Sequence, residues 1–168
     1  MLESNSSKHS KVLRRVLIPI DGSNESKKSL IWYTDNMKRD GDLLMFVHVI
    51  DPVLPSALSA LSAECELMPA GASFYIPESE MYKAKSMCQQ LVYEANKFRI
   101  KSEALIQVDT KPGPAIVKLI SEKKIDIVVM SSRGLGFWRR NFIGSVSSYI
   151  LHHSNIPVSI VPLSGNQS

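Results

Sequence analysis

Two consecutive stretches decide the fold: Ile125-Asp-Ile-Val-Val-Met130, and then Ser131-Ser-Arg-Gly-Leu-Gly-Phe-Trp-Arg-Arg-Asn-Phe-Ile-Gly-Ser145. The apolar first stretch predicts a buried strand, and residues 144–153 predict a helix after the loop. A glycine-bearing loop between a strand and a helix is where α/β proteins hold phosphates. Free backbone N–H groups and the positive end of the helix dipole meet the ligand there. This unit therefore suggests a nucleotide.

The same alternation of strand and helix extends through the rest of the chain. In the first helix we expect Leu30, Ile31, Thr34 and Met37 to share a buried face, after a turn at 21–26. Strands that are apolar throughout, each followed by a helix, indicate an α/β fold with a parallel sheet covered by helices on both faces. The apolar runs predict strands at 15–20, 42–50, 103–108, 125–130 and 157–161, and the helical patterns run to about Lys38 and over 78–99, 111–123 and 144–153.

The chain of 168 residues suits one domain. We expect a disordered polar tail over 1–13, a domain over 14–163 and a short tail over 164–168. The segment 51–77 is almost uncharged and contains four prolines, and Ser56 to Leu67 could form a short helix within it. Its role stays open.

Composition narrows the function classes. The net charge of +4 comes partly from Lys8, Lys11 and neighbouring arginines, and no basic stretch interleaved with aromatic residues predicts a nucleic-acid partner. Cys65 and Cys88 form neither a disulfide framework nor a metal site. No apolar run approaches the roughly 20 residues of a spanning helix, so we expect no membrane partner. Without an apolar leader, the expected location is cytoplasmic.

The residues that could bind a ligand or take part in a reaction directly follow the predicted strands. Pro19-Ile-Asp21, His48-Val-Ile-Asp51 and the loop 131–145 each follow a predicted strand. Ligands of α/β sheets bind outside the carboxyl ends of the strands, so these segments could converge on one crevice. The loop lacks the Gly-Lys-Ser/Thr ending of a Walker P-loop. Its own spacing is Gly134, nine residues, then Gly144-Ser145.

This spacing resembles the universal stress protein family, whose pattern is Gly-x-x-Gly, nine residues, Gly-Ser/Thr. The strands at Val16-Leu-Ile-Pro-Ile-Asp21 and Val47-His-Val-Ile-Asp51 are similar to the family's first two strands, and 125–130 and 156–161 to its last two. The resemblance covers roughly residues 14 to 163. The form of the loop looks like the versions found in plants and invertebrate animals.

The resemblance implies a Rossmann-like, five-stranded parallel sheet in the order 3-2-1-4-5, a homodimer, and binding of ATP, ADP or AMP, with Mg²⁺ as an optional companion. Asp21 would lie by adenine and ribose, Val49 would contact adenine through its backbone, and Met130 would lie by the ribose. Glycine in the loop lets backbone N–H groups approach phosphate and permits positive φ. The full set of binding residues implied is Pro19, Ile20, Asp21, Val49, Met130, Ser131, Ser132, Arg133, Gly134, Gly144, Ser145, Val146 and Ser147.

Several residues keep two interpretations. Ser131 replaces the first glycine of the pattern, so it either strains the backbone or only changes the room beside the ribose. Asp21 could bind the ligand or cap the first helix. His48 is expected to be a satisfied core histidine.

Three functions remain in competition. The leading hypothesis is an ATP-binding stress-response or signalling module without fast catalysis, because the loop offers no evident general base and no carboxylate pair for Mg²⁺. The alternatives are an interaction module without nucleotide binding, and a slow ATP hydrolase. We expect the homodimer to form through strand 157–161, whose Val158, Ile160 and Val161 would otherwise leave an apolar edge exposed.

Overall fold

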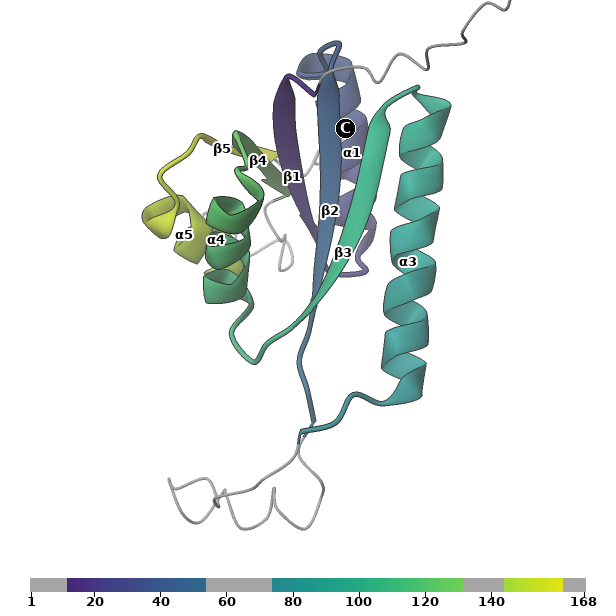
Figure 1. Cartoon of the computed structure of the whole chain (residues 1–168), viewed down its shortest axis with the longest axis vertical. Helices are drawn as coiled ribbons and strands as arrows, with labels where there is room; N and C mark the ends of the chain where they lie inside the picture. Colours follow the sequence, from purple (N-terminus) through teal and green to yellow (C-terminus); the bar gives the residue numbers. More distant parts are fainter. Residues whose placement is uncertain (1–11, 54–73, 132–143, 162–168) are drawn as a thin grey trace, which may run out of the picture.

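The structure is a computed structural model that describes residues 12–53, 74–131 and 144–161 (Figure 1). Strands and helices alternate along these residues, as the sequence predicts. In chain order the elements are β1 Arg14–Ile20, α1 Asn24–Asn36, β2 Asp42–Ile50, α3 Glu78–Lys97, β3 Lys101–Val108, α4 Pro112–Lys123, β4 Ile127–Ser131, α5 Ser145–His153 and β5 Val158–Val161. The possible helix at 56–67 lies outside the described residues, as do both chain ends.

The five strands form one parallel sheet in the order β3-β2-β1-β4-β5, which confirms the predicted fold. Strand β1 is central, and its Val16, Leu17 and Ile18 have no exposed surface. A strand covered on both faces must be apolar at every position, which is why β1 and β2 read as continuous apolar runs.

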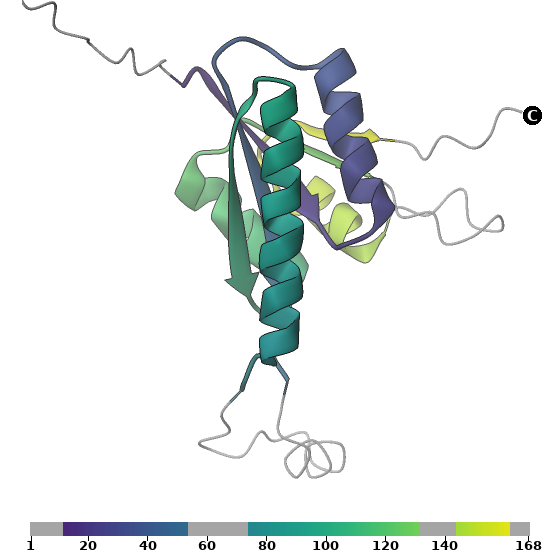
Figure 2. The same ribbon diagram turned by 90° about the vertical axis from the view of Figure 1, so that its right-hand side faces the viewer.

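Helices cover both faces of this sheet, as Figures 1 and 2 show from two directions. Helices α1 and α3 pack on one face and α4 and α5 on the other. Each face has its own core, with Phe46 and Leu91 in the first and Met45 and Leu119 in the second. Alternate residues of β2 thus supply opposite cores, as the pleat requires.

Helix α1 corrects two details of the sequence reading. It begins at Asn24, inside the predicted turn, and ends at Asn36. Ile31 is 51% exposed rather than buried, whereas Tyr33 is fully buried. The buried stripe therefore runs through Leu30 and Tyr33. Tyrosine can occupy this position because its hydroxyl donates to the carboxylate of Asp42.

The Asp42 carboxylate is the centre of a buried polar network at the start of the sheet. Its side chain is 2% exposed and accepts two hydrogen bonds from Arg14, at 2.9 and 2.6 Å, and one from the Arg39 N–H at 2.9 Å. Burial alone would raise the pKa of Asp42, but the hydrogen bonds from Arg14, Tyr33 and Arg39 outweigh it and hold the pKa below its ordinary value. Burial and the same carboxylate raise the pKa of Tyr33. This network joins β1, β2 and α1.

Two helices end on a left-handed residue that is not glycine. Arg99 follows α3 with φ 56°, and Lys124 follows α4 with φ 51°. In each case the N–H of the next residue, Ile100 or Ile125, donates a hydrogen bond back to the carbonyl five positions earlier. These are Schellman motifs, in which glycine is usual at the left-handed position. A larger residue there costs about 1 kcal/mol.

Close contact at Gly113 fixes α4 against α5. A Cβ at this position would lie 2.9 Å from ring atoms of Tyr149, a separation that real Cβ atoms do not show. The Tyr149 ring is held from its other side by stacking on His153, with centroids 3.9 Å apart. The glycine therefore sets how near the two helices approach.

Replacing Gly113 by alanine is expected to lower the free energy of unfolding by about 1–3 kcal/mol, because the added methyl group overlaps the Tyr149 ring. Urea denaturation measures the change. In a Tyr149→Ala background the same substitution should be neutral or stabilising, since the ring is gone. An equal loss in both backgrounds would contradict the assigned contact.

Replacing Asp42 by asparagine is expected to cost about 3 kcal/mol at pH 7, because Arg14 loses its buried partner. The folded pKa of Asp42 lies below the unfolded one, so its stabilisation is present above pH 3.8 and is lost as the pH falls through the folded pKa. Denaturation at pH 7 and pH 3 should show the gap between wild type and variant narrowing in acid. The exposed Asp35→Asn serves as control, and a gap independent of pH would refute the assignment.

Candidate functional site

A pocket opens at the carboxyl ends of the central strands, where the strand order reverses. The chain leaves β1 toward β2 on one side and returns as β4 on the other, so the helices after β1 and β4 lie on opposite faces. Such a switch point leaves a crevice in parallel α/β sheets. The pocket has a volume of about 170 Å³ and is lined by Pro19, Ile20, Asp21, Val47, His48, Val49, Pro112, Ile116, Met130, Ser131, Gly144, Ser145, Val146 and Ser147.

The inner wall of the pocket is apolar. Val47 and Met130 are almost fully buried on the sheet, and Ile116 of α4 is 3% exposed above them. A closed apolar cavity of roughly 150 Å³ is enough for one benzene ring. The pocket of about 170 Å³ therefore has room for an aromatic ring against its apolar wall, and the rest of a larger ligand would extend toward the mouth.

Helix α5 begins at this pocket with Gly144 as its N-cap. The first N–H groups of a helix have no intrahelical partner and carry the positive end of its dipole. Those of Ser145, Val146 and Ser147 border the pocket, and Ser147 is 5% exposed. Gly144 has φ −56°, which any residue adopts, so positive φ does not explain this glycine.

The end of β2 leaves a backbone carbonyl at the pocket. Pairing with β1 stops at Ile20 opposite His48, while pairing with β3 continues to Ile50. The Ile50 carbonyl accepts from the Asp109 N–H on the β3 side. Successive carbonyls of a strand point to opposite sides, so that of Val49 points past the end of β1. No β1 strand residue stands opposite it.

Asp21 lies at the rim, directly after β1. Its carboxylate accepts hydrogen bonds from the backbone N–H of Ser23 at 3.0 Å and from the Ser23 hydroxyl at 2.6 Å. This Asx-type turn leads into α1, but Ser23 is the N-cap and no side chain caps the helix, so Asp21 shapes the turn rather than caps α1. Asp21 is nevertheless exposed and lines the pocket.

His48 forms a hydrogen bond of 2.9 Å between its Nδ1 and the Ile20 carbonyl. Because a carbonyl only accepts, Nδ1 carries the proton in this contact. The residue is satisfied, as the sequence predicts, but it is half-buried and lines the pocket. It ties the last residue of β1 to β2 where the pocket opens.

Ten of the thirteen predicted binding residues line this pocket. Their role toward a ligand stays a prediction. Ser132, Arg133 and Gly134 lie outside the described residues, as do Arg139 and Arg140. The sequence reading missed the wall formed by Pro112 and Ile116. The sequence Lys111-Pro-Gly-Pro114 could have indicated this wall. It starts α4 directly after β3 and so places the first turn of the helix at the carboxyl ends of the strands.

Ser131 is not strained. It is the last residue of β4, paired with Val161, and among the described residues the only non-glycine positions with positive φ are Arg99 and Lys124. The first of the two alternatives for Ser131 is therefore wrong. The second alternative remains. Ser131 is half-buried in the pocket wall, where its hydroxyl changes the space and the polarity of the pocket.

No group of three or more His, Cys, Asp or Glu in 12–53, 74–131 and 144–161 is placed to hold a metal ion. No helix in these ranges is long and apolar enough to cross a membrane.

Comparison with known proteins settles the family. The family model described as "Universal stress protein family" matches residues 13–162. The chain belongs to the universal stress protein family. A universal stress protein of Synechocystis is 28% identical over 150 residues, which cover 88% of this chain and 96% of that protein. The stress response protein NhaX of Bacillus subtilis is 26% identical, with the same two shares covered. The plant- and invertebrate-like subtype stays a prediction.

Solved structures share the universal stress protein fold. The hypothetical protein MJ0577 superposes with a TM-score of 0.68 at 22% identity, over 92% of this chain and 99% of that one. A family member from Arabidopsis thaliana, solved with AMP bound, gives 0.63 at 17% identity, over 92% and 94%. One from Archaeoglobus fulgidus in complex with dAMP gives 0.62 at 17% identity, over 89% and 98%.

Replacing Ser131 by glycine should not stabilise the protein. Because Ser131 has ordinary strand geometry, glycine would only add flexibility to the unfolded chain, and we expect a loss of about 0.5–1 kcal/mol. Thermal and urea denaturation test this. Lys124→Gly is the matched comparison, since glycine relieves positive φ there. A Ser131→Gly variant more stable than wild type would show that the serine is strained after all.

Proposed function

We propose that this universal stress protein binds adenine nucleotides, with ATP as the main ligand, and acts as a stress-response or signalling module rather than as a fast enzyme. The observation that carries the proposal is the single pocket at the switch point. It joins an apolar recess of ring size to the N-terminus of α5. A nucleotide has these two parts, an aromatic base and an anionic phosphate chain.

The recess suits the base. Val47, Met130 and Ile116 would pack on its faces, and the Val49 carbonyl would accept a hydrogen bond from an exocyclic amine at its edge. Adenine offers an amine at this edge, whereas guanine offers an oxygen, which would leave two acceptors facing each other. Such a mismatch is penalised strongly in a buried site.

The ribose and phosphates would follow toward the mouth of the pocket. Asp21 is the carboxylate that lines the pocket within the described residues, and it can accept from ribose hydroxyls. The N–H groups of 145–147 and the Ser145 and Ser147 hydroxyls would then face the phosphates. Loop residues Ser132, Arg133 and Gly134 complete the proposed set, with Mg²⁺ as an optional companion of the phosphates.

Related structures support the choice of adenine. Universal stress proteins have been solved with AMP, cAMP and dAMP bound. These ligands share the base and differ in sugar and phosphate, which agrees with a site whose most enclosed part is the ring recess.

The pocket favours binding over turnover. Asp21 is the one carboxylate among its described lining residues, and its oxygen already holds the N–H and hydroxyl of Ser23. Fast phosphoryl transfer needs a positioned nucleophile together with metal-bound phosphates. We therefore expect hydrolysis of ATP to be slow if it occurs.

We also propose a homodimer in the cytoplasm that forms through β5. This strand is the edge of the sheet next to β4, and Val158 and Ile160 remain half-buried there. Pairing with a two-fold mate would cover their apolar side chains and satisfy the edge.

A second candidate function is a protein-interaction module without nucleotide. Val53 and Tyr75 pair through two backbone hydrogen bonds of 2.9 and 3.1 Å and so close the base of the segment between β2 and α3. Both side chains are exposed, at 43% and 52%, as is Phe74 at 45%. An apolar group of this kind at the base of a long connection fits a partner surface.

Calorimetric titration with ATP, GTP and adenosine tests the leading proposal. We expect ATP to bind at least roughly tenfold more tightly than GTP, because of the Val49 carbonyl. Ser145→Asp places a negative charge where phosphate would lie, so it should weaken ATP by at least roughly tenfold and leave adenosine within about twofold. The neutral Ser145→Asn is the matched control.

The two candidate functions give different results. An aspartate in the first turn favours the helix dipole, so the Ser145→Asp variant should unfold no earlier than wild type. No binding of ATP or adenosine at millimolar concentration would reject the nucleotide proposal and leave the interaction module. Equal weakening of ATP and adenosine by Ser145→Asp would place the phosphates elsewhere.

A further inference from the structure

The end of the sheet opposite the nucleotide pocket is strongly basic. It comprises Arg14 and Arg15 at the start of β1 and the segments 37–42, 98–101 and 123–126, which lead into β2, β3 and β4. Three carboxylates lie among its cations, those of Asp40, Asp42 and Asp126. The eight cations are Arg14, Arg15, Lys38, Arg39, Arg99, Lys101, Lys123 and Lys124, which we call the basic end.

Eight cations against three carboxylates give the basic end a net charge of +5. The whole chain has +4, so the remainder of the protein has −1. Within the part of the chain that the structure describes, positive charge is therefore concentrated at this end. The cations come from sequence positions between 14 and 124, and only the fold brings them together.

The register places these connections on one level across the sheet. Lys101 pairs with Leu43, and Arg14 pairs with Asp42, so Arg15 lies level with Leu43. Arg15 in turn bonds the Asp126 carboxylate through its N–H at 2.7 Å and the Lys123 carbonyl through its guanidinium at 3.0 Å. With neighbouring strands 4.7–4.9 Å apart, β3 to β4 spans roughly 15 Å.

The basic end also extends above and below the sheet. Helices α1 and α3 end beside it on one face, and α4 ends beside it on the other (Figures 1 and 2). Lys38, Arg39, Arg99, Lys101, Lys123 and Lys124 are all exposed. The cations thus spread over both faces of the sheet, with a hollow between β2 and β3 that Lys38, Arg39, Arg99 and Lys101 line.

Helix dipoles account for only part of this charge. Each helix C-terminus is equivalent to about half a negative charge, so α1, α3 and α4 together bring roughly −1.5. The Asp42 carboxylate is already satisfied by Arg14 and Tyr33. A clear positive excess remains at the surface.

Backbone strain marks two of these cations. Arg99 and Lys124 are the non-glycine residues with positive φ in the described part of the chain, and both belong to the basic end. Glycine would close the same Schellman motifs without strain. Strain that persists where a simpler residue would fit indicates a function for the side chain.

Apolar side chains lie among the cations. Leu13, which precedes β1, is 68% exposed and lies against Gly41. Phe98 is 36% exposed, and its carbonyl accepts from the Lys38 ammonium at 2.6 Å. Basic residues around exposed leucine and phenylalanine are the composition of surfaces that rest on lipid headgroups and insert apolar side chains between them.

We propose that the basic end docks on the surface of an anionic phospholipid membrane, with the nucleotide pocket facing away from it. This proposal replaces the expectation from the sequence that the protein has no membrane partner. A membrane presents a plane of negative charge, which matches cations spread over both faces of the sheet. Nucleic acid presents lines of phosphate along a groove, for which this end offers no protruding helix or strand in its described residues. The inference does not depend on nucleotide binding.

Sedimentation with vesicles tests the proposal on the full chain. We expect binding to phosphatidylcholine vesicles containing about 30% phosphatidylserine, weakened by added salt, and none to phosphatidylcholine alone. The double variant Arg99→Gly, Lys124→Gly should bind roughly tenfold more weakly or worse, since each basic residue near an anionic surface contributes to partitioning. It should also unfold no earlier than wild type, because glycine relieves both strained positions.

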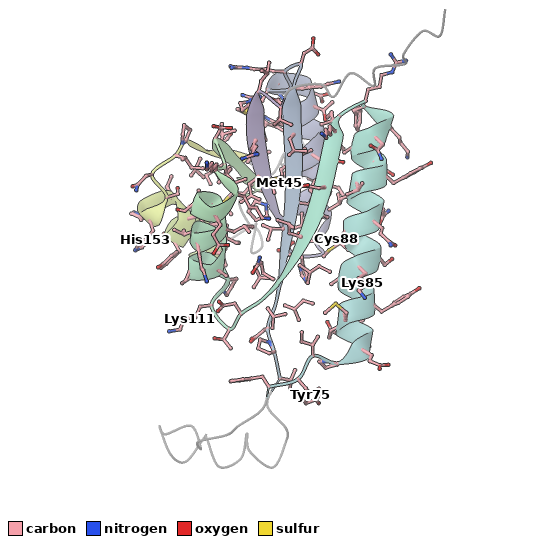
Figure 3. The ribbon with its side chains drawn as sticks, in the orientation of Figure 1. Met45, Tyr75, Lys85, Cys88, Lys111 and His153 are labelled. Atoms are coloured by element: carbon pink, nitrogen blue, oxygen red, sulfur yellow. The ribbon has the colours of Figure 1, made fainter. Side chains whose placement is uncertain are left out.

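The matched control is Lys85→Gln, Lys118→Gln, which removes two exposed lysines from helix surfaces away from the basic end (Lys85 is labelled in Figure 3). It should bind vesicles like wild type. Failure to bind phosphatidylserine vesicles at low salt would overturn the proposal. So would tighter binding to a duplex oligonucleotide than to vesicles, or equal loss in the two double variants.

Discussion

The rest of the structure depends on the central position of β1. Strands are added to the sheet first on the β2 side of β1 and then on the β4 side, so the strand order reverses at β1. The helices that follow β1 and β4 must therefore cover opposite faces. The reversal opens one crevice at the carboxyl ends of β1 and β4. It also brings the first turns of α4 and α5 to that crevice, because each helix begins where a strand ends.

Two local contacts hold this arrangement in place. The Asp42 carboxylate joins β1, β2 and α1 at the start of the sheet. The contact of Gly113 with Tyr149 sets the spacing of α4 and α5 at the other end, where both helices line the pocket. Neither contact involves a proposed ligand-binding residue. Substitutions at these contacts can therefore alter the shape of the pocket without changing the residues that would bind the ligand.

The sequence predicted the fold well because the three inner strands, β2, β1 and β4, are largely buried. A run such as Asp42 to Ile50 has few other interpretations. Ile31 was misplaced because a helical period alone does not say whether isoleucine or tyrosine is buried, and the deciding partner, Asp42, comes from another element. Whether Ser131 is strained could not be predicted, because strain depends on the φ angle and residue identity does not fix that angle. Ile116 was missed because its place beside Met130 arises only from packing.

The two ends of the sheet have different chemistry. The carboxyl end combines an apolar recess with free helix N–H groups, whereas the opposite end gathers cations at the helix C-termini. Parallel α/β topology produces this polarity, since all strands and all helices share their directions. The charges added by the sequence increase it, with a net +5 at one end and −1 for the remainder.

In the proposed binding mode, an adenine nucleotide occupies the switch-point pocket with its phosphates at α5. Backbone amide chemical shifts on titration with adenosine and then ATP test this most directly. Adenosine should shift the amides around Ile20 and Val49, and only ATP should also shift those of Ser145, Val146 and Ser147. Unchanged amides at 145–147 under saturating ATP would contradict the claim.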